Sequence, residues 1–364
     1  MMSRALACPT VAGLALSLMG TGVAYGQGGN GMKLDFVVCP TSANNTRNGE
    51  GDMIELKDGS LLVAYTRWGG GGSDNDRAVI AGRISKDGGT TWGEDFVIQE
   101  NDADMNVMSV SLLRLKSGEI MFGYLHKNSD ADCRTIVRIS SDEGKTWGPK
   151  VVADIGPGYH VQNNDRMVQL STGRILSPVA WVMNGAKEGN YRSFCYYSDD
   201  GGKTWQASRT WVEITASSGA QEPGVVELKD GRVMMIFRST AGYVGKSYSS
   251  DGGVTWSPAE MIKELPSPCG PQTIERIPST GDLLLIWENN PNSPNGDQKR
   301  TPLTAAISRD DGQTWEHIRN IADDPNAGYC YTSCTFVGDD VLLTYYAPGG
   351  LHLSRMPVSW FYEK

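Results

Sequence analysis

The sequence predicts an all-β protein, a six-bladed β-propeller with four antiparallel strands in each blade. The pattern Ser-x-Asp-x-Gly-x-Thr-Trp occurs five times, beginning at Ser85, Ser140, Ser198, Ser249 and Ser308. A long sequence period of this kind is typical of a propeller, a solenoid or a linear array. A second feature occurs six times, namely an apolar run, a glycine-containing turn and another apolar run. Six such hairpins predict six blades.

The aspartate of each copy is expected to hold a hairpin turn. Its carboxylate can accept hydrogen bonds from the backbone of the turn, while the glycine two residues later supplies a positive φ angle. The threonine and tryptophan that follow suit the start of a strand. Five equivalent copies favour a structural role for these aspartates. A calcium site in each loop is less favoured, because each copy offers few oxygen side chains.

Each unit is expected to run through strand A, the glycine turn, strand B, a variable loop, strand C, the aspartate turn and strand D. The last unit, residues 326–364, lacks its aspartate turn, and an early strand at residues 34–38 lacks a hairpin. We predict that this N-terminal strand pairs into the last blade and closes the ring, which removes an exposed sheet edge. Because the strands alternate in direction, both kinds of turn share one face. The variable loops share the opposite face, where a binding site is expected.

Residues 1–26 are expected to form a signal peptide, with Arg4, an apolar run and then Ala-Tyr-Gly. We therefore expect a secreted or periplasmic protein with a single propeller domain at residues 27–364. No apolar run is long enough to span a membrane. The net charge is −9 without a basic block, which disfavours nucleic acid as a partner. No motif indicates a cofactor or a metal site, and the six cysteines after residue 26 are compatible with disulfides or buried thiols.

The five aspartate turns set in six such units resemble the Asp-box, or BNR-repeat, proteins of the sialidase superfamily. The resemblance covers nearly all of residues 27–364. It implies a six-bladed propeller and an exo-glycosidase. In that family, three arginines bind the substrate carboxylate, a tyrosine–glutamate pair acts as nucleophile and an aspartate is the acid/base.

The sequence departs from the family where the first blade opens. Family members usually carry the first arginine in a Phe/Tyr-Arg-Ile-Pro motif, whereas residues 47–52 here read Arg-Asn-Gly-Glu-Gly-Asp. Aligned on the glycine turn, the arginine position falls near Glu50, and Arg47 is the residue that can compensate from the preceding loop. No catalytic residue is assigned from the family by motif.

The candidate catalytic residues are therefore the acidic side chains at the starts of the A strands. Glycoside hydrolysis needs two carboxyl-type groups across the bond, one of them able to hold a proton. Glu50 and Asp52 are two apart on one strand, so we expect both to point to the same side and to raise one pKa. Asp165 and Glu222 occupy the same point in later units. Each candidate has a structural alternative. For Glu50 and Asp52 it is neutralisation by Arg47 or Arg67, for Asp165 a turn cap, and for Glu222 an ion pair with an arginine such as Arg238.

The expected substrate-binding residues lie on the same face and combine arginines, aromatic rings, amides and histidines, a mixture that suits sugars. They are Arg67, Trp68, His126, His160, Asn164, Arg166, Gln221, Arg238, Gln272, Trp287 and Tyr331. The alternatives are exposed loop arginines, hydrogen-bonded histidines and tryptophans packed between blades.

The resulting prediction is a secreted, sialidase-like exo-glycoside hydrolase that releases a terminal acidic sugar, such as sialic acid, from a glycoprotein, glycolipid or polysaccharide. Two alternatives remain open at this point. The same propeller can act as a hydrolase or lyase on a uronate-type glycan, or it can bind carbohydrate or protein without catalysis, because the fold alone does not decide function.

Overall fold

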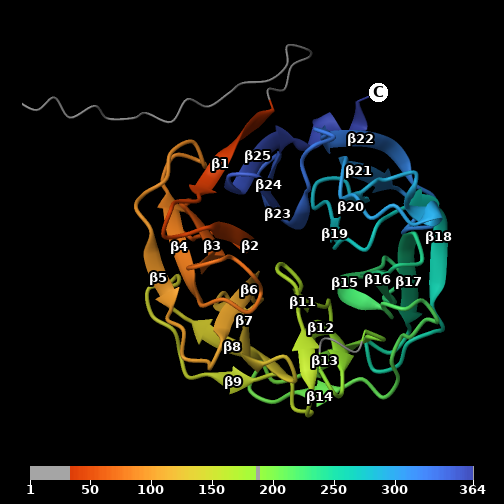
Figure 1. The fold of residues 1–364 in the computed structure, drawn as a ribbon, viewed down its shortest axis with the longest axis horizontal. Coiled ribbons are helices and arrows are strands. Elements are labelled where there is room, and N and C mark those ends of the chain that lie inside the picture. The colour runs from red at the N-terminus through yellow and green to blue at the C-terminus, as the bar shows by residue number, and fades with distance from the viewer. Residues whose placement is uncertain (1–32, 186–188, 364) are drawn as a thin grey trace, which may run out of the picture.

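The structure is a computed structural model that describes residues 33–185 and 189–363. The expected signal peptide, residues 1–26, lies outside the described residues. The regular secondary structure consists almost entirely of β-strands, which are arranged as sheets around a central axis (Figure 1). Within the described residues the exceptions are two short 3₁₀ helices, η2 (Ser293–Asn295) and η3 (Val358–Tyr362). The all-β propeller arrangement predicted from the repeats is confirmed.

Four sheets of the described chain have four antiparallel strands each. The first holds β2 (Arg47–Glu55), β3 (Leu61–Trp68), β4 (Ala78–Ser85) and β5 (Phe96–Gln99). The second holds β15 (Gln221–Glu227), β16 (Val233–Arg238), β17 (Tyr243–Ser249) and β18 (Glu260–Pro266). The third holds β19 (Thr273–Arg276), β20 (Leu283–Glu288), β21 (Leu303–Ser308) and β22 (Glu316–Ala322).

The fourth sheet joins the two ends of the chain. It contains β23 (Cys330–Val337), β24 (Asp340–Ala347) and β25 (Gly350–Pro357), and β1 (Leu34–Pro40) completes it. Strand β1 pairs antiparallel with β25, from Leu34 opposite Arg355 to Pro40 opposite Gly350. In Figure 1 the red β1 accordingly lies beside the blue β25. The predicted closure of the ring by an N-terminal strand is confirmed.

The prediction of six separate four-stranded blades is wrong, because the described chain has four such blades and one sheet of nine strands. The nine strands are β6 (Asn106–Arg114), β7 (Ile120–Ser129), β8 (Asp132–Ser140), β9 (Val151–Val152), β10 (Tyr159–Val161), β11 (Val168–Gln169), β12 (Ile175–Val182), β13 (Arg192–Ser198) and β14 (Gln206–Ala207). A parallel pairing of Tyr159 in β10 with Cys133 in β8 joins the second and third predicted units. The stretch expected to form strand A of the third unit is divided into β10 and β11, and β10 pairs with both β8 and β12.

The aspartate turns have the structural role that the repeats predict. Asp87 accepts hydrogen bonds from the backbone N–H of Thr91 at 2.8 Å and from its hydroxyl at 2.6 Å. The Ser85 hydroxyl donates to Asp87 and accepts from the Gly89 N–H, both at 2.8 Å. The same contacts recur at Asp142, Asp200, Asp251 and Asp310.

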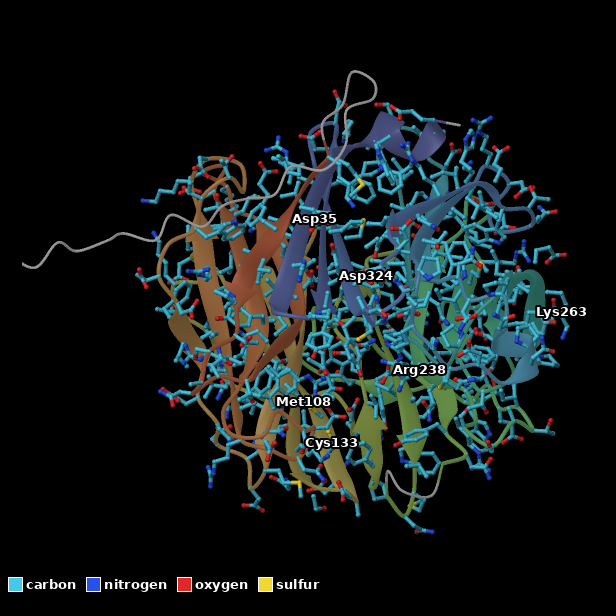
Figure 2. The ribbon with its side chains drawn as sticks, turned by 45° about the horizontal axis from the view of Figure 1, so that its top comes forward. Asp35, Met108, Cys133, Arg238, Lys263 and Asp324 are labelled. Atoms are coloured by element: carbon cyan, nitrogen blue, oxygen red, sulfur yellow. The ribbon has the colours of Figure 1, made fainter. Side chains whose placement is uncertain are left out.

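The core consists of apolar layers between neighbouring sheets. Strand alternation turns one face of each sheet toward the next sheet, so Ile54 and Leu62 pack with Leu112 and Phe122. A matching layer, which includes Val38, packs the ring-closing sheet against β2 and β3. All six cysteines of the described chain are unpaired, and every one except Cys269 is buried. In Figure 2, Met108 and Arg238 lie on the inner side of the ring, whereas Lys263 lies at its outer edge.

Candidate functional site

A repeated backbone irregularity surrounds the axis at one end of the ring. Strands β2, β6, β15 and β23 each contain a β-bulge near their start, and a residue of each bulge has a positive φ angle. These residues are Glu50 (50°), Ser109 (57°), Glu222 (45°) and Tyr331 (57°), and Asp165 (54°) occupies the matching place between β10 and β11. Bulges redirect side chains, and a left-handed conformation outside glycine costs roughly 1–3 kcal/mol, so such residues gather at functional sites.

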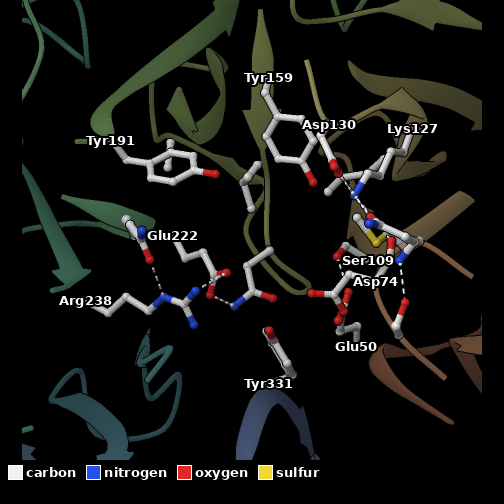
Figure 3. A pocket seen from close by; sticks show the side chains of 18 residues that line it. Glu50, Asp74, Ser109, Lys127, Asp130, Tyr159, Tyr191, Glu222, Arg238 and Tyr331 are labelled. Carbon is white, nitrogen blue, oxygen red and sulfur yellow. Dashed lines mark hydrogen bonds and ion pairs between the residues drawn. The ribbon is translucent and has the colours of Figure 1, made fainter. Parts of the chain in front are cut away.

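Four of these five residues, all except Asp165, line a cavity of about 480 Å³ (Figure 3). The other walls come from the β3–β4 loop with Asp74, from β7 with Lys127, and from Tyr159 and Tyr191. No residue of an aspartate turn contributes to this cavity. The cavity therefore lies on the face that the strand directions assign to the variable loops.

The Arg47 guanidinium is paired with two carboxylates that line one side of the cavity, those of Glu50 and Asp74. Its Nη2 atom lies 2.7 Å from Glu50 Oε1, and its Nη1 atom lies 2.5 Å from Asp74 Oδ1. The guanidinium stacks 4.0 Å from the centre of the buried Trp68 ring. The Ser109 hydroxyl donates to the other oxygen of Glu50. Burial raises the pKa of Glu50 to about 7, with Arg47 opposing the shift and Asp74 and Glu222 adding to it.

Glu222 and Arg238 form the opposite side. Arg238 Nη2 lies 2.8 Å from Glu222 Oε1, and the amide of Asn163 donates to Glu222 Oε2 at 3.3 Å. Arg238 Nε donates to Gln221 Oε1 at 3.2 Å, whereas its Nη1 atom is buried without a hydrogen-bond partner. The guanidinium is therefore held in place and keeps one donor for a further acceptor.

Tyr331 lies between these two sides, and Figure 3 shows its hydroxyl pointing into the cavity between Glu222 and Glu50. Burial raises its pKa above the ordinary value, and the carboxylates of Glu222 and Glu50 act in the same direction. The Tyr331 phenol in turn raises the pKa of three arginines, Arg47, Arg238 and Arg300, against the lowering effect of burial. Three guanidinium groups, two from strands and one from a loop, thus interact electrostatically with one phenol.

Arg300 reaches this position from the loop between β20 and β21. Its Nη2 donates to the Cys269 carbonyl at 2.9 Å. Behind it, Glu288 is fully buried, and neither of its carboxylate oxygens has a hydrogen-bond partner. Burial raises the pKa of Glu288 to about 7, although Arg300 opposes the shift. This carboxyl is the negative partner that faces Arg300 from within the protein.

The wall farthest from Tyr331 contains a buried cation. The Lys127 side chain is 2% exposed, and its Nζ lies 3.2 Å from Asp130 Oδ1. It also donates to the Asn75 side chain at 2.5 Å and lies 5.2 Å from the centre of the Tyr159 ring. Because the neighbouring Met108, Leu125, Val161 and Ala180 are apolar, this end of the cavity combines polar tips with an apolar floor.

A second layer of buried polar residues lies beneath the cavity and includes several predicted site residues. Asp52 accepts backbone hydrogen bonds from Met53 and Leu112, both at 2.7 Å, and Asp165 accepts one from Cys334 at 2.9 Å. Burial raises the pKa of Asp52 well above its ordinary value and that of Asp165 to about 6. The expectation that Glu50 and Asp52 act as a pair is wrong, because the bulge between them breaks the alternation and turns only Glu50 into the cavity.

Three further predicted residues tie inner strands together across the axis. Arg166 Nη2 donates to the Gln272 carbonyl at 2.8 Å, and the Asn164 amide donates to the Gly51 carbonyl at 2.8 Å. The Gln272 amide donates to the Ser267 hydroxyl at 3.2 Å. None of the three lines the cavity.

The remaining predicted binding residues lie away from the cavity. Trp68 and Trp287 are 0% and 1% exposed, so they offer no face for a sugar, and packing between strands explains both. Arg67 is paired with Asp95 at 3.8 Å, and His126 lies 3.3 Å from Asp102. His160 is fully buried against the Tyr196 hydroxyl at 3.1 Å, and burial lowers its pKa to about 4.

The structure thus brings together Glu50, Glu222, Gln221, Arg238 and Tyr331 among the predicted residues. Sequence reasoning did not select Asp74 or Arg300, and it treated Arg47 only as a compensating charge. The available signal was position, since Asp74 follows four glycines in one B-to-C loop and Arg300 ends another. Asn106 of β6 anchors the first of these loops by donating to the Asp74 and Asp76 carbonyls at 2.9 and 2.8 Å.

Residues 33–185 and 189–363 contain no group of three or more His, Cys, Asp or Glu side chains placed to hold a metal ion. They also contain no helix with the length and apolar character needed to cross a membrane.

Comparison with known proteins places this geometry in a family. Residues 59–344 match the BNR repeat-like domain. A sialidase from Micromonospora viridifaciens is 26% identical over 99% of this chain, which spans 59% of that relative's length. A sialidase from Bacteroides fragilis is 24% identical over 60% of this chain and 40% of its own.

Solved structures share the fold at lower identity. A protein of unknown function from Dyadobacter fermentans superposes with a TM-score of 0.71 at 20% identity, covering 89% of this chain and 97% of its own. The intramolecular trans-sialidase from Ruminococcus gnavus superposes with a TM-score of 0.70 at 15% identity, covering 90% and 98%. The match over residues 59–344 means that this chain belongs to the BNR repeat-like domain family, within the sialidase-like superfamily that the aspartate turns predict.

Proposed function

We propose that this protein is a sialidase-like exo-glycoside hydrolase that releases a terminal sugar carrying a carboxylate. The observation that carries the proposal is the cavity in which Tyr331 lies between Glu222 and Glu50 with Arg238 beside it, while Arg47 and Arg300 also interact electrostatically with the phenol. Guanidinium groups bind carboxylates through paired, charge-assisted hydrogen bonds, so three of them suit an anionic sugar. The cavity of about 480 Å³ fits a single sugar residue at the end of a chain.

The proposed first step is attack by Tyr331 on the anomeric carbon. The phenol is a weak nucleophile in its protonated form, and its raised pKa means that it needs a base to remove the proton. Glu222 is the carboxylate next to it, and Arg238 holds Glu222 at 2.8 Å. As the new carbon–oxygen bond forms, the phenolic proton passes to Glu222 and the glycosidic bond to the leaving group breaks.

Asp74 is the proposed general acid. It lies on the β3–β4 loop that lines the cavity, where its side chain is 60% exposed and can meet the leaving oxygen. Asp74 donates a proton to that oxygen, and as a carboxylate it then accepts a proton from the water that attacks the glycosyl–tyrosine intermediate. The bond to Tyr331 breaks, Glu222 returns the proton to the phenol, and the net change is hydrolysis of one glycosidic bond.

The test is release of the free sugar from sialyl-oligosaccharides and from a panel of uronate-terminated glycans. Tyr331→Phe and Glu222→Gln are expected to lower kcat/KM by about 1,000-fold or more while leaving the fold intact. Tyr248→Phe, on β17 away from the cavity, is the matched control and keeps full activity. Absence of sugar release from every glycan would contradict the proposal. Cleavage with an unsaturated, ultraviolet-absorbing product would instead indicate a lyase.

A further inference from the structure

The starting observation is that the Arg47 guanidinium is already bound by the protein's own carboxylates. Glu50 takes Nη2 at 2.7 Å and Asp74 takes Nη1 at 2.5 Å. Arg238 differs, because its Nη1 atom is buried and has no hydrogen-bond partner. One arginine of the cluster therefore has a donor available for a carboxylate, whereas on Arg47 both Nη atoms are engaged.

The charges that face Glu50 make this arrangement unfavourable for an incoming anion. Arg47 is on its own strand, Asp74 faces it from the β3–β4 loop, Glu222 from β15 and Tyr331 from β23. Like charges at such short range in a partly buried site repel each other. A substrate carboxylate that approaches Arg47 therefore meets the Glu50 carboxylate at the position it must occupy.

We propose that Glu50 is a specificity-determining residue that occupies the carboxylate position on Arg47 and must take up a proton before an acidic sugar can bind there. This inference rests on the proposed function. When the sugar binds, its carboxylate replaces Glu50 at Nη2 of Arg47, and Glu50 accepts one proton from solvent and becomes neutral. The Ser109 hydroxyl, which now donates to Glu50, stays beside the protonated group and can accept from it.

Two features of the structure support this role. Glu50 has the left-handed backbone of a bulge, with φ of 50°, and this conformation fixes its carboxyl over the arginine. Burial, Asp74 and Glu222 bring its pKa to about 7, so the change of charge falls near neutral pH. A neutral ligand of the same shape does not compete with Glu50 and gains nothing from its protonation.

The test measures binding of N-acetylneuraminic acid and of its uncharged methyl ester by calorimetry from pH 5 to pH 9. For the unchanged protein, affinity for the acid should fall by about 10-fold per pH unit above pH 7, with uptake of nearly one proton per ligand at pH 8. The Glu50→Gln variant should bind the acid with an affinity that is nearly independent of pH and with no proton uptake. The methyl ester should show no pH dependence with either protein.

Two further variants keep the test decisive. Glu264→Gln removes an exposed glutamate away from the cavity and should leave the pH dependence unchanged. Ser109→Ala removes the hydroxyl that stabilises ionised Glu50, so it should move the midpoint of the pH dependence upward, and this result is available even if Glu50→Gln fails to fold. A pH slope or a proton uptake that persists in Glu50→Gln overturns this inference alone. Failure of every protein to bind the acid at any pH overturns both this inference and the proposed function.

Discussion

The two ends of the ring differ in the feature that recurs from unit to unit. At one end, five aspartate turns repeat the same residues and the same hydrogen bonds, with Asp87 and its equivalents each accepting from a threonine N–H and hydroxyl. At the other end, the bulges repeat a backbone conformation but not a residue type. Glutamate, serine, aspartate and tyrosine occupy positions with φ between 45° and 57°.

This difference separates a scaffold from a site. Identical side chains in every unit can perform only one task five times, and here that task is to close a turn. A repeated backbone with varied side chains brings unlike groups to one axis, which is what acid, base, nucleophile and anion binding require together. The strain of the left-handed residues is concentrated at the end that holds the cavity.

The largest effect expected at the cavity end, beyond the Tyr331 and Glu222 variants, follows from Asp74→Asn. Loss of the general acid should lower kcat/KM by about 100- to 1,000-fold on a natural glycan, while the melting temperature stays unchanged. A substrate with a nitrophenol leaving group needs little protonation and should lose much less. Steady-state rates on the two substrates measure the difference.

Asp76→Asn is the control for this prediction, because Asp76 lies in the same loop and accepts from the Ser73 N–H at 2.7 Å without lining the cavity. It should keep nearly full activity. Equal losses on the two substrates for Asp74→Asn would contradict a proton-donating role and indicate that Asp74 only orients Arg47.

Glu288→Gln probes whether the cavity end also carries a cost in stability. The ordinary pKa of this carboxyl is 4.5 and its folded-state pKa is about 7. Between these values the unfolded chain gives up a proton that the folded chain retains, so the stability of the unchanged protein falls as pH rises from about 4.5 to 7 and is constant above. The contribution of Glu288 is roughly 3 kcal/mol. Glu288→Gln should remove this contribution and make the slope smaller, whereas the contributions of Glu50 and Asp165, whose pKa values are also raised, remain.

Chemical denaturation at pH 4.5, 6 and 8 measures the slope. The exposed Glu213, which pairs with Arg192 at 3.0 Å, supplies the matched variant Glu213→Gln, and that variant should keep the slope of the unchanged protein. If Glu288→Gln keeps it as well, the buried carboxyl is not the group responsible.

The sequence allowed the scaffold end to be predicted in detail and the cavity end only in part. Glycine and aspartate at fixed spacing specify a turn locally, so the turns and their face followed from the residues alone. Glu222, Arg238 and Tyr331 could also be assigned to the cavity end, because each lies at the start or end of a recognisable strand. The identity of the site residues on β2 was less accessible, since Gly49 and Gly51 flank the bulge but the positive φ angle falls on Glu50, which is not a glycine.

Loops account for most of what was missed. Asp74 and Arg300 reach the axis through long B-to-C connections whose path depends on tertiary contacts, such as the Asn106 amide on the Asp74 carbonyl. The prediction that two tryptophans bind the substrate failed for a different reason, which is their burial. Trp68 and Trp287 sit at strand ends on the correct face, but the neighbouring sheets bury them, and burial is not encoded in a strand's own sequence.

Asp251→Ala tests the scaffold end at the level of one turn. The variant loses the hydrogen bonds from the Thr255 N–H, the Thr255 hydroxyl and the Ser249 hydroxyl, at 2.8, 2.7 and 2.8 Å. Because these groups are partly exposed and water replaces the lost partner, the expected loss of stability is about 1–2 kcal/mol. Activity at a temperature well below the melting point should not change. Asp251→Asn keeps one acceptor and should fall between the two proteins.

Gly59→Ala is the smallest change at the same end. Gly59 has φ of 82° in the turn between β2 and β3, and a Cβ atom there would contact nothing within 4 Å. The only cost is the left-handed backbone, about 1 kcal/mol, and thermal unfolding measures it. Gly328→Ala is the control, since Gly328 also has open space but lacks a positive φ. An equal loss of stability in both variants would mean that Gly59 is not needed for the conformation of the turn. A loss in Gly59→Ala alone assigns the cost to the left-handed backbone, and Glu50 and Tyr331 adopt the same backbone conformation at the cavity without being glycines.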